Sequence, residues 1–233
     1  MAPKQIIALG GGGFSMEPNN LLLDRYILTQ ARTERPSVCF LPTASGDSSA
    51  YIVNFYTAYT NLASRPSHVT LFNRTPDLRD TLLKQDIIFV GGGNTKSMLA
   101  VWREWDLPGI LREAWEAGVV LAGISAGAIC WFEQGVTDSG AAGLAVLDCL
   151  GFLPGSCCPH YDGEAERRPA YRRFVESAEI RPGWALDDGV GIHFVDSEVH
   201  RIVSSRPQAH AYRVSVVDGV AHEEDLAVNY LGN

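Results

Sequence analysis

The sequence lacks any long hydrophobic run. No window approaches the roughly 18 uninterrupted apolar residues that a membrane-spanning helix needs. The apolar run nearest the N-terminus, residues 6–9, is too short for the core of a signal peptide, and glycines follow it instead of a small-residue cleavage site. These absences predict a cytoplasmic protein with no membrane partner.

The sequence also lacks an excess of positive charge and an even set of cysteines. It has 19 lysines and arginines against 27 aspartates and glutamates, which gives a formal net charge of −8. No basic stripe is present to neutralise nucleic-acid phosphates, so we expect no nucleic-acid partner. Five cysteines in a chain of 233 residues disfavour a disulfide framework and fit a reducing compartment.

Short apolar runs alternate with helical patterns through the first 130 residues. The runs of strand length are residues 5–9, 37–42, 68–72, 86–90 and 119–123. Helical spacing is clearest over residues 51–62, 95–102 and 107–117. Strands that are apolar on both faces and alternate with helices predict an α/β fold with a mostly parallel sheet flanked by helices.

The pattern changes after residue 187, where shorter, alternating runs follow one another: 191–195, 198–203, 210–217 and 220–228. Turns at residues 196–197 and 218–219 between them predict antiparallel hairpins at the end of the sheet. The sequence contains no internal repeat and no linker-like segment. We therefore expect a single α/β domain spanning residues 1–233.

Two glycine clusters follow predicted strands, at residues 10–13 and 91–93. A dinucleotide fingerprint beginning at either cluster would need glycine where Ser15 and Lys96 stand, and neither cluster contains the Gly-Lys-Ser/Thr of a phosphate loop. We therefore expect no nucleotide cofactor. The clusters are either tight turns at strand ends or, for residues 91–93, a stretch of bare backbone N–H groups that faces a ligand.

The most informative stretch is Gly123-x-Ser125-x-Gly127, directly after a buried strand and before an apolar helical run. In this context the pattern indicates a nucleophile elbow, in which small neighbours allow a sharp turn that exposes the serine hydroxyl. The amide of Ala126 would then point toward the developing oxyanion.

A serine nucleophile needs a base and an acid that orients the base. His160, on a proline-bounded loop, is the favoured base, and His193 is the alternative. The turn that contains Asp187 and Asp188 can supply the acid. The chain order Ser, His, Asp differs from that of an α/β-hydrolase, which argues against that fold.

Four segments together resemble the peptidase E (aspartyl dipeptidase) family of serine peptidases, to which cyanophycinase is related. They are Val-Gly-Gly-Gly-Asn-Thr at 90–95, Gly-Ile-Ser-Ala-Gly-Ala at 123–128, Pro-His-Tyr at 159–161 and Leu-Asp-Asp-Gly at 186–189. The resemblance implies an α/β fold similar to class I glutamine amidotransferases, with serine in place of their cysteine. It also implies hydrolysis of dipeptides that carry an N-terminal aspartate.

The resemblance also implies roles for individual residues. Ser125 would be the nucleophile and His160 the base, while Asp188 falls where relatives often have glutamate, with Asp187 as the alternative. Asp138 matches a further family aspartate near the site. The oxyanion hole would combine the amide of Ala126 with that of Gly92 or Gly93.

An aspartyl substrate needs local positive charge in an acidic protein. Four arginines follow His160 closely: Arg167, Arg168, Arg172 and Arg173. Because an arginine fork can grip a carboxylate through two hydrogen bonds, we expect Arg168, then Arg172, to bind the substrate side chain. The pair Cys157-Cys158 with His160 does not reproduce the ligand spacing of a tetrahedral metal site, so we expect no metal.

The sequence therefore predicts a metal-independent serine exopeptidase that acts on small peptides with an N-terminal aspartate and needs no cofactor. One alternative is a cyanophycinase-like hydrolase of β-aspartyl-arginine peptides. Another is a non-catalytic relative that only binds a ligand. We expect a monomer or a homodimer, the latter if the C-terminal hairpins leave an exposed edge strand.

Overall fold

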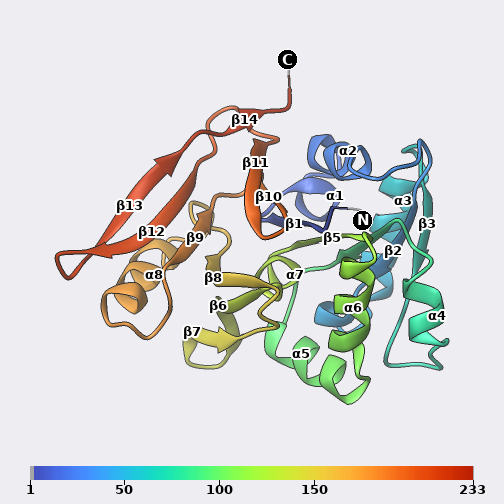
Figure 1. The fold of residues 1–233 in the computed structure, drawn as a ribbon, viewed down its shortest axis with the longest axis horizontal. Helices are drawn as coiled ribbons and strands as arrows, with labels where there is room; N and C mark the ends of the chain where they lie inside the picture. The colour runs from blue at the N-terminus through green and yellow to red at the C-terminus, as the bar shows by residue number, and fades with distance from the viewer. Residues whose placement is uncertain (1–2, 233) are drawn as a thin grey trace.

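The computed structural model describes residues 3–232, which form two β-sheets with helices packed against them (Figure 1). The larger sheet has eight strands in the order β14-β11-β10-β1-β5-β4-β2-β3. Its parallel part consists of β1 (Gln5–Leu9), β5 (Val120–Ile124), β4 (Ile87–Val90), β2 (Ser37–Leu41) and β3 (Arg65–His68). On the other side of β1 lies β10 (Val190–Val195), which is antiparallel to β1 and to the next strand, β11 (Glu198–Ser204). The last strand, β14 (Asn229–Tyr230), pairs with β11 in parallel.

Helices cover both faces of the parallel strands, which explains why those strands are apolar throughout. One face packs against α2 (Leu22–Leu28) and α3 (Ser49–Tyr59) through a core that includes Phe14 and Phe55. The other face packs against α5 (Thr95–Glu104) and α6 (Leu107–Glu116) through Trp102 and Trp115. The predicted mostly parallel, helix-flanked sheet is therefore confirmed.

The smaller sheet has six strands in the order β13-β12-β9-β8-β6-β7. Their bounds are β13 (Val220–Leu226), β12 (Ala211–Val217), β9 (Gly183–Leu186), β8 (Leu153–Cys158), β6 (Phe132–Gly140) and β7 (Gly143–Asp148). Helix α8 (Arg167–Glu176) packs against this sheet through Tyr171 and Val175. Phe132 and Leu186 of the smaller sheet share one hydrophobic cluster with Ile6 of the larger sheet, so the two sheets pack together.

The C-terminal hairpins are present but do not both extend one sheet. Strands β10 and β11 continue the larger sheet, whereas β12 pairs with β9 and carries β13 into the smaller sheet. Figure 1 shows the β12–β13 hairpin reaching away from the parallel strands, with α8 beside it.

The third strand lies earlier than the sequence pattern predicted. It covers Arg65–His68, not residues 68–72. The amides of Leu71 and Phe72 donate to Asp47 Oδ2, at 2.6 and 3.0 Å, so the backbone leaves the ladder there.

Three short elements complete the chain: α1 (Gly13–Met16), α4 (Leu78–Leu82) and α7 (Ala126–Ile129), with a 3₁₀ turn at Thr43–Ser45. Within residues 3–232, no helix combines the length and the apolar character that crossing a bilayer requires.

Candidate active site

Ser125 stands on a strained turn between β5 and α7. Its backbone has φ 55° and ψ −113°, a conformation that L-residues rarely adopt. Glycines on either side make the turn possible, because a methyl group on Gly123 would overlap the carbonyl of Gly127, and one on Gly127 would overlap the carbonyl of Val90. The close approach of bare backbone therefore explains both glycines of the predicted elbow.

His160 and Asp188 form a hydrogen-bonded pair. His160 follows β8 and also has a positive φ, 53°. Its Nδ1 lies 2.7 Å from Asp188 Oδ1, and both side chains are largely buried. The amide of Asp188 donates to Asp162 Oδ1 at 2.7 Å, which fixes the loop between β9 and β10 that carries the carboxylate. With Nδ1 committed to Asp188, Nε2 is the ring nitrogen left to accept a proton.

The end of β1 holds all three loops in alignment. The consecutive carbonyls of residues 9, 10 and 11 accept hydrogen bonds from the amides of Ser125, His160 and Gly189, at 3.2, 3.1 and 3.1 Å. The serine, the histidine and the acid-bearing turn are therefore anchored one after another on a single stretch of backbone. No hydrogen bond joins Ser125 to His160 in the part of the chain that the structure describes; catalytic contacts of this kind often tighten only when substrate binds.

The first glycine cluster serves this arrangement. A methyl group on Gly11 would overlap Asp188 Oδ1, and one on Gly163 would overlap Asp188 Oδ2. The carboxylate thus lies between two stretches of bare backbone. The sequence pattern alone does not distinguish a glycine that makes room for Asp188 from a glycine in an ordinary turn.

Asp187 and His193, the alternatives for the acid and the base, lie in other surroundings. Asp187 Oδ2 accepts from the amide of His210 at 2.9 Å, and burial raises the pKa of Asp187. His193 is buried in β10, where Nδ1 contacts the Tyr26 hydroxyl at 2.8 Å and Nε2 contacts Gln5 Oε1 at 3.1 Å. Burial, with a smaller effect of His200, lowers the pKa of His193 to about 4.

The backbone amides near Ser125 divide into free and occupied donors. Among the described residues, the amides of Gly93 and Ala126 donate no hydrogen bond. Gly92 borders the serine, because a methyl group on it would lie 3.3 Å from Ser125 Cβ. Its amide, however, donates to the Tyr51 hydroxyl at 3.3 Å, a contact that the sequence did not predict.

The two arginines predicted to bind substrate are paired within the protein. Arg168 forms a salt bridge with Glu223 of β13, and Arg172 lies 3.5 Å from the same carboxylate. The Tyr161 hydroxyl also donates to Glu223. Burial raises the pKa of Glu223, but the hydrogen bonds from Arg168 and Tyr161 outweigh it and lower the pKa below its ordinary value. Two cations thus share one internal anion, which leaves one net positive charge.

Asp138 projects from β6 with 63% of its side chain exposed. Arg167 Nη2 lies 3.8 Å from its carboxylate, and the rest of that buried guanidinium contacts Glu164 and the carbonyl of Val136. The Asp138 carboxylate therefore faces Arg167 on one side and is exposed to solvent on the other.

No group of three or more potential metal ligands comes together within residues 3–232. Cys157 and Cys158 are buried, and burial raises the pKa of Cys158 to about 12. At neutral pH it is therefore a protonated thiol.

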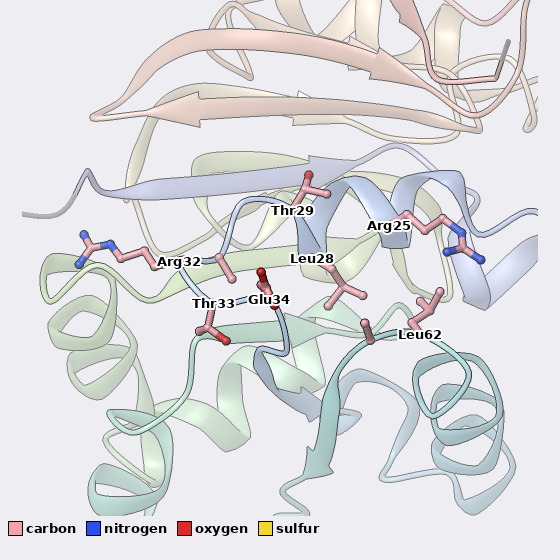
Figure 2. A pocket seen from close by; sticks show the side chains of 9 residues that line it. Arg25, Leu28, Thr29, Arg32, Thr33, Glu34 and Leu62 are labelled. Carbon is pink, nitrogen blue, oxygen red and sulfur yellow. The ribbon is translucent and has the colours of Figure 1, made fainter.

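An open hollow of about 610 Å³ lies elsewhere (Figure 2). Its lining includes Arg25, Leu28 and Arg32 of α2 and the following loop, together with Leu62. These segments precede β2 and β3 and lie at the amino-terminal ends of the parallel strands, whereas Ser125 follows the carboxyl end of β5. None of the predicted site residues lines this hollow.

Known proteins resemble this chain in sequence. Residues 6–202 match the model of peptidase family S51. A protein of Bacillus subtilis (strain 168) named uncharacterized peptidase YgaJ is 56% identical over 230 residues, which cover 98% of this chain and 100% of that protein. Peptidase E of Shewanella amazonensis (strain ATCC BAA-1098 / SB2B) is 31% identical over 135 residues, 52% of each chain.

Solved structures resemble the fold. A peptidase from an acI-B1 Actinobacterium superposes with a TM-score of 0.74 at 15% identity, over 97% of this chain and 95% of that one. A putative peptidase E protein from Listeria monocytogenes EGD-e gives a TM-score of 0.64 at 20% identity, over 85% of this chain and 97% of that one. At these identities the likeness concerns the fold.

Proposed function

Because this chain belongs to peptidase family S51, we propose that it is a serine exopeptidase that cleaves dipeptides with an N-terminal aspartate, using Ser125, His160 and Asp188. Membership of the family confirms the resemblance drawn from the sequence. The observation that supports the catalytic roles best is the anchoring of all three loops on the carbonyls of residues 9–11, with His160 Nδ1 bound to Asp188.

The reaction follows from these positions. Ser125 Oγ bonds to the carbonyl carbon of the aspartyl residue while its proton passes to His160 Nε2, and Asp188 stabilises the imidazolium through Nδ1–H. The carbonyl electrons move to the oxygen, which receives hydrogen bonds from the amides of Ala126 and Gly93. When the C–N bond breaks, the histidine returns the proton to the leaving amine. A water molecule then bonds to the carbonyl carbon of the acyl-enzyme while His160 takes its proton, and the bond to Ser125 Oγ breaks as the histidine returns that proton to the serine.

Substrate binding is proposed at two charged groups. The open carboxylate of Asp138 is suited to the α-ammonium group of the substrate. The cluster of Arg168, Arg172 and Glu223 keeps one net positive charge, which is suited to the aspartyl side chain. Because Glu223 already occupies the Arg168 fork, the substrate carboxylate would join or displace an existing pair and would not meet a free guanidinium.

The experiment is to measure release of the free N-terminal amino acid from Asp-Leu, Glu-Leu and Ala-Leu, with the Ser125→Ala variant as the blank. Serine-dependent cleavage of Asp-Leu well above that of the other two supports the proposal. Cleavage of β-aspartyl-arginine polymer in place of Asp-Leu would assign the cyanophycinase-like activity, and equal cleavage of all three dipeptides would contradict acidic specificity.

A further inference from the structure

Tyr51, near the start of α3, lies against the glycine turn that borders Ser125. Its ring packs edge-on against Phe40, with 5.0 Å between centroids, and at a tilt against Phe14 at 5.6 Å. A methyl group on Gly91 would lie 2.9 Å from a carbon of the Tyr51 ring, so glycine at that position makes room for the phenol. Packing from both sides therefore sets where the hydroxyl is placed.

The Tyr51 hydroxyl makes two polar contacts. It accepts a hydrogen bond from the amide of Gly92 at 3.3 Å, and it lies 2.6 Å from Ser15 Oγ. Gly92 also borders Ser125. The phenol and the proposed nucleophile therefore both lie next to the same glycine, whose amide is one that the family resemblance implied as an oxyanion donor.

The hydrogen-bonding capacity of the phenol leaves it a proton to give. A tyrosine hydroxyl donates once and can accept as well. In the contact with Ser15 either hydroxyl can donate. When Ser15 donates, the Tyr51 hydroxyl accepts from both Ser15 and the Gly92 N–H, and its own proton is available to a third group. Burial raises the pKa of Tyr51, so the group remains a protonated donor at neutral pH. An anion that forms beside Gly92 favours this orientation, because it attracts that proton.

We propose that Tyr51 is a catalytic residue, whose hydroxyl donates a hydrogen bond to the oxyanion formed when Ser125 attacks, beside the amides of Ala126 and Gly93. Ser15 is a positioning residue that acts through Tyr51. This inference rests on the proposed function, since it takes Ser125 as the nucleophile. In this arrangement the Tyr51 hydroxyl, and not the Gly92 amide that donates to it, is the third oxyanion donor.

The first test is Tyr51→Phe, which keeps the ring packing and removes only the hydroxyl. Loss of one oxyanion donor typically costs about 100-fold in kcat. We expect a loss of that size for Asp-Leu, with KM within about twofold, because the contact is made only in the transition state. The matched control is Tyr56→Phe, in the same helix, whose hydroxyl contacts His68 Nδ1 at 2.9 Å; it should keep wild-type kcat.

Coupling to Ser15 supplies a second readout. Ser15→Ala should lower kcat less than Tyr51→Phe does. The double variant should be no slower than Tyr51→Phe alone, since the serine acts through the phenol. Additive losses would contradict the positioning role of Ser15.

A readout that needs no peptide separates this inference from the proposed substrate. A fluorophosphonate that labels Ser125 also develops negative charge on an oxygen in the same place, so Tyr51→Phe should slow labelling by a factor similar to its effect on kcat. If the wild type is labelled at Ser125 but does not cleave Asp-Leu, the substrate proposal fails while the labelling comparison still tests Tyr51. Labelling or cleavage by Tyr51→Phe at or above the wild-type rate would show that the hydroxyl only blocks Gly92, and would overturn the inference. A wild type that neither labels nor cleaves would overturn both proposals.

Discussion

At the scale of single residues, the site depends on backbone conformations that only close support can maintain. Ser125 and His160 both have positive φ, which costs about 1–3 kcal/mol per residue. The support is visible, because each of their amides donates to one of the adjacent carbonyls at the end of β1. Strain of this kind concentrates where a side chain must be aimed.

Replacing each of the two neighbouring aspartates should have a different effect on kcat. Asp188→Asn leaves the shape of the pair but removes the negative charge that stabilises the imidazolium, and its NH2 group can face Nδ1 and favour the wrong tautomer of His160, so kcat should fall about 10³–10⁴-fold. Asp187→Asn keeps an oxygen that can accept from the amide of His210 and should retain near wild-type kcat. The measurement is steady-state kcat of both variants side by side. A larger loss in Asp187→Asn than in Asp188→Asn would reverse the assignment.

Gly11→Ala tests the packing of the acid. The added methyl group would overlap Asp188 Oδ1, and a displacement of about 1 Å at a catalytic group can cost roughly 100-fold in rate. We expect a loss of that order in kcat/KM. The matched control is Gly109→Ala in α6, where a methyl group meets no atom within 4 Å; helix propensity predicts that it stabilises the protein by up to about 1 kcal/mol. Full activity in Gly11→Ala would show that Asp188 is not held there.

Asp24 should make the protein less stable as pH rises. It is buried, accepts hydrogen bonds from the amide of Phe14 and the hydroxyl of Tyr59, and burial raises its pKa from 3.8 to about 6. The folded state therefore binds the proton more tightly than the unfolded state. The free energy of unfolding, relative to Asp24→Asn, should fall on the order of 3 kcal/mol between pH 4 and pH 7. Urea unfolding of both proteins at several pH values checks this, and parallel pH profiles would contradict it.

His193 should act in the opposite direction over the same pH range. Its pKa is lowered from 6.5 to about 4, so the unfolded state binds the proton more tightly. Its contribution to stability is fully present above about pH 6.5 and is lost as pH falls toward 4. Relative to His193→Gln, the free energy of unfolding of the wild type should rise on the order of 3 kcal/mol from pH 4 to pH 7. A falling difference would show that the imidazole is charged in the fold.

At the scale of elements, the β12–β13 hairpin joins the loop of the proposed base to the smaller sheet. Glu223 on β13 contacts Tyr161, the residue after His160, and also Arg168 and Arg172 of α8. Strand β12 holds the other side of this cluster, since Arg168 also lies over the ring of Tyr212, 5.0 Å from its centroid. The hairpin therefore restrains the loop that carries His160.

Glu223→Gln should weaken this connection. It leaves two arginines without their anion and a nearly buried amide in place of a carboxylate, and breaking a pair of this kind costs about 1–3 kcal/mol or more. We expect the free energy of unfolding to fall by about that amount. The control is Glu224→Gln at the next position, which is exposed and should change stability by less than about 0.5 kcal/mol. Chemical denaturation of both variants measures the difference, and equal values would contradict the structural role of Glu223.

At the scale of the whole molecule, the sequence predicted the parallel sheet better than the rest. Strands β1, β2, β4 and β5 are apolar because both faces are buried, and such runs are plain in the sequence. The smaller sheet was not predicted as a separate sheet. Strand β8, Leu-Pro-Gly-Ser-Cys-Cys, has little strand propensity, and it forms because β6 and β9 pair with it on either side.

In the candidate site, too, the features with a local sequence signal were predicted and those made by distant segments were not. Ser125 carries a local signal, because its glycines and the preceding strand adjoin it in sequence. Contacts between distant segments carry no such signal: Tyr51 reaches Gly92 across 41 positions and Glu223 reaches Tyr161 across 62. The single domain, the oligomeric state and the cytoplasmic location stay predictions.

The proposed mechanism depends above all on Ser125 as the nucleophile. The most direct measurement is the rate of aspartate release from Asp-Leu by Ser125→Ala, beside the wild type and with both proteins shown to unfold at the same denaturant concentration. We expect the wild type to release aspartate and the variant to release none above the blank. A variant that folds normally and still cleaves Asp-Leu at a rate close to the wild type would contradict this expectation.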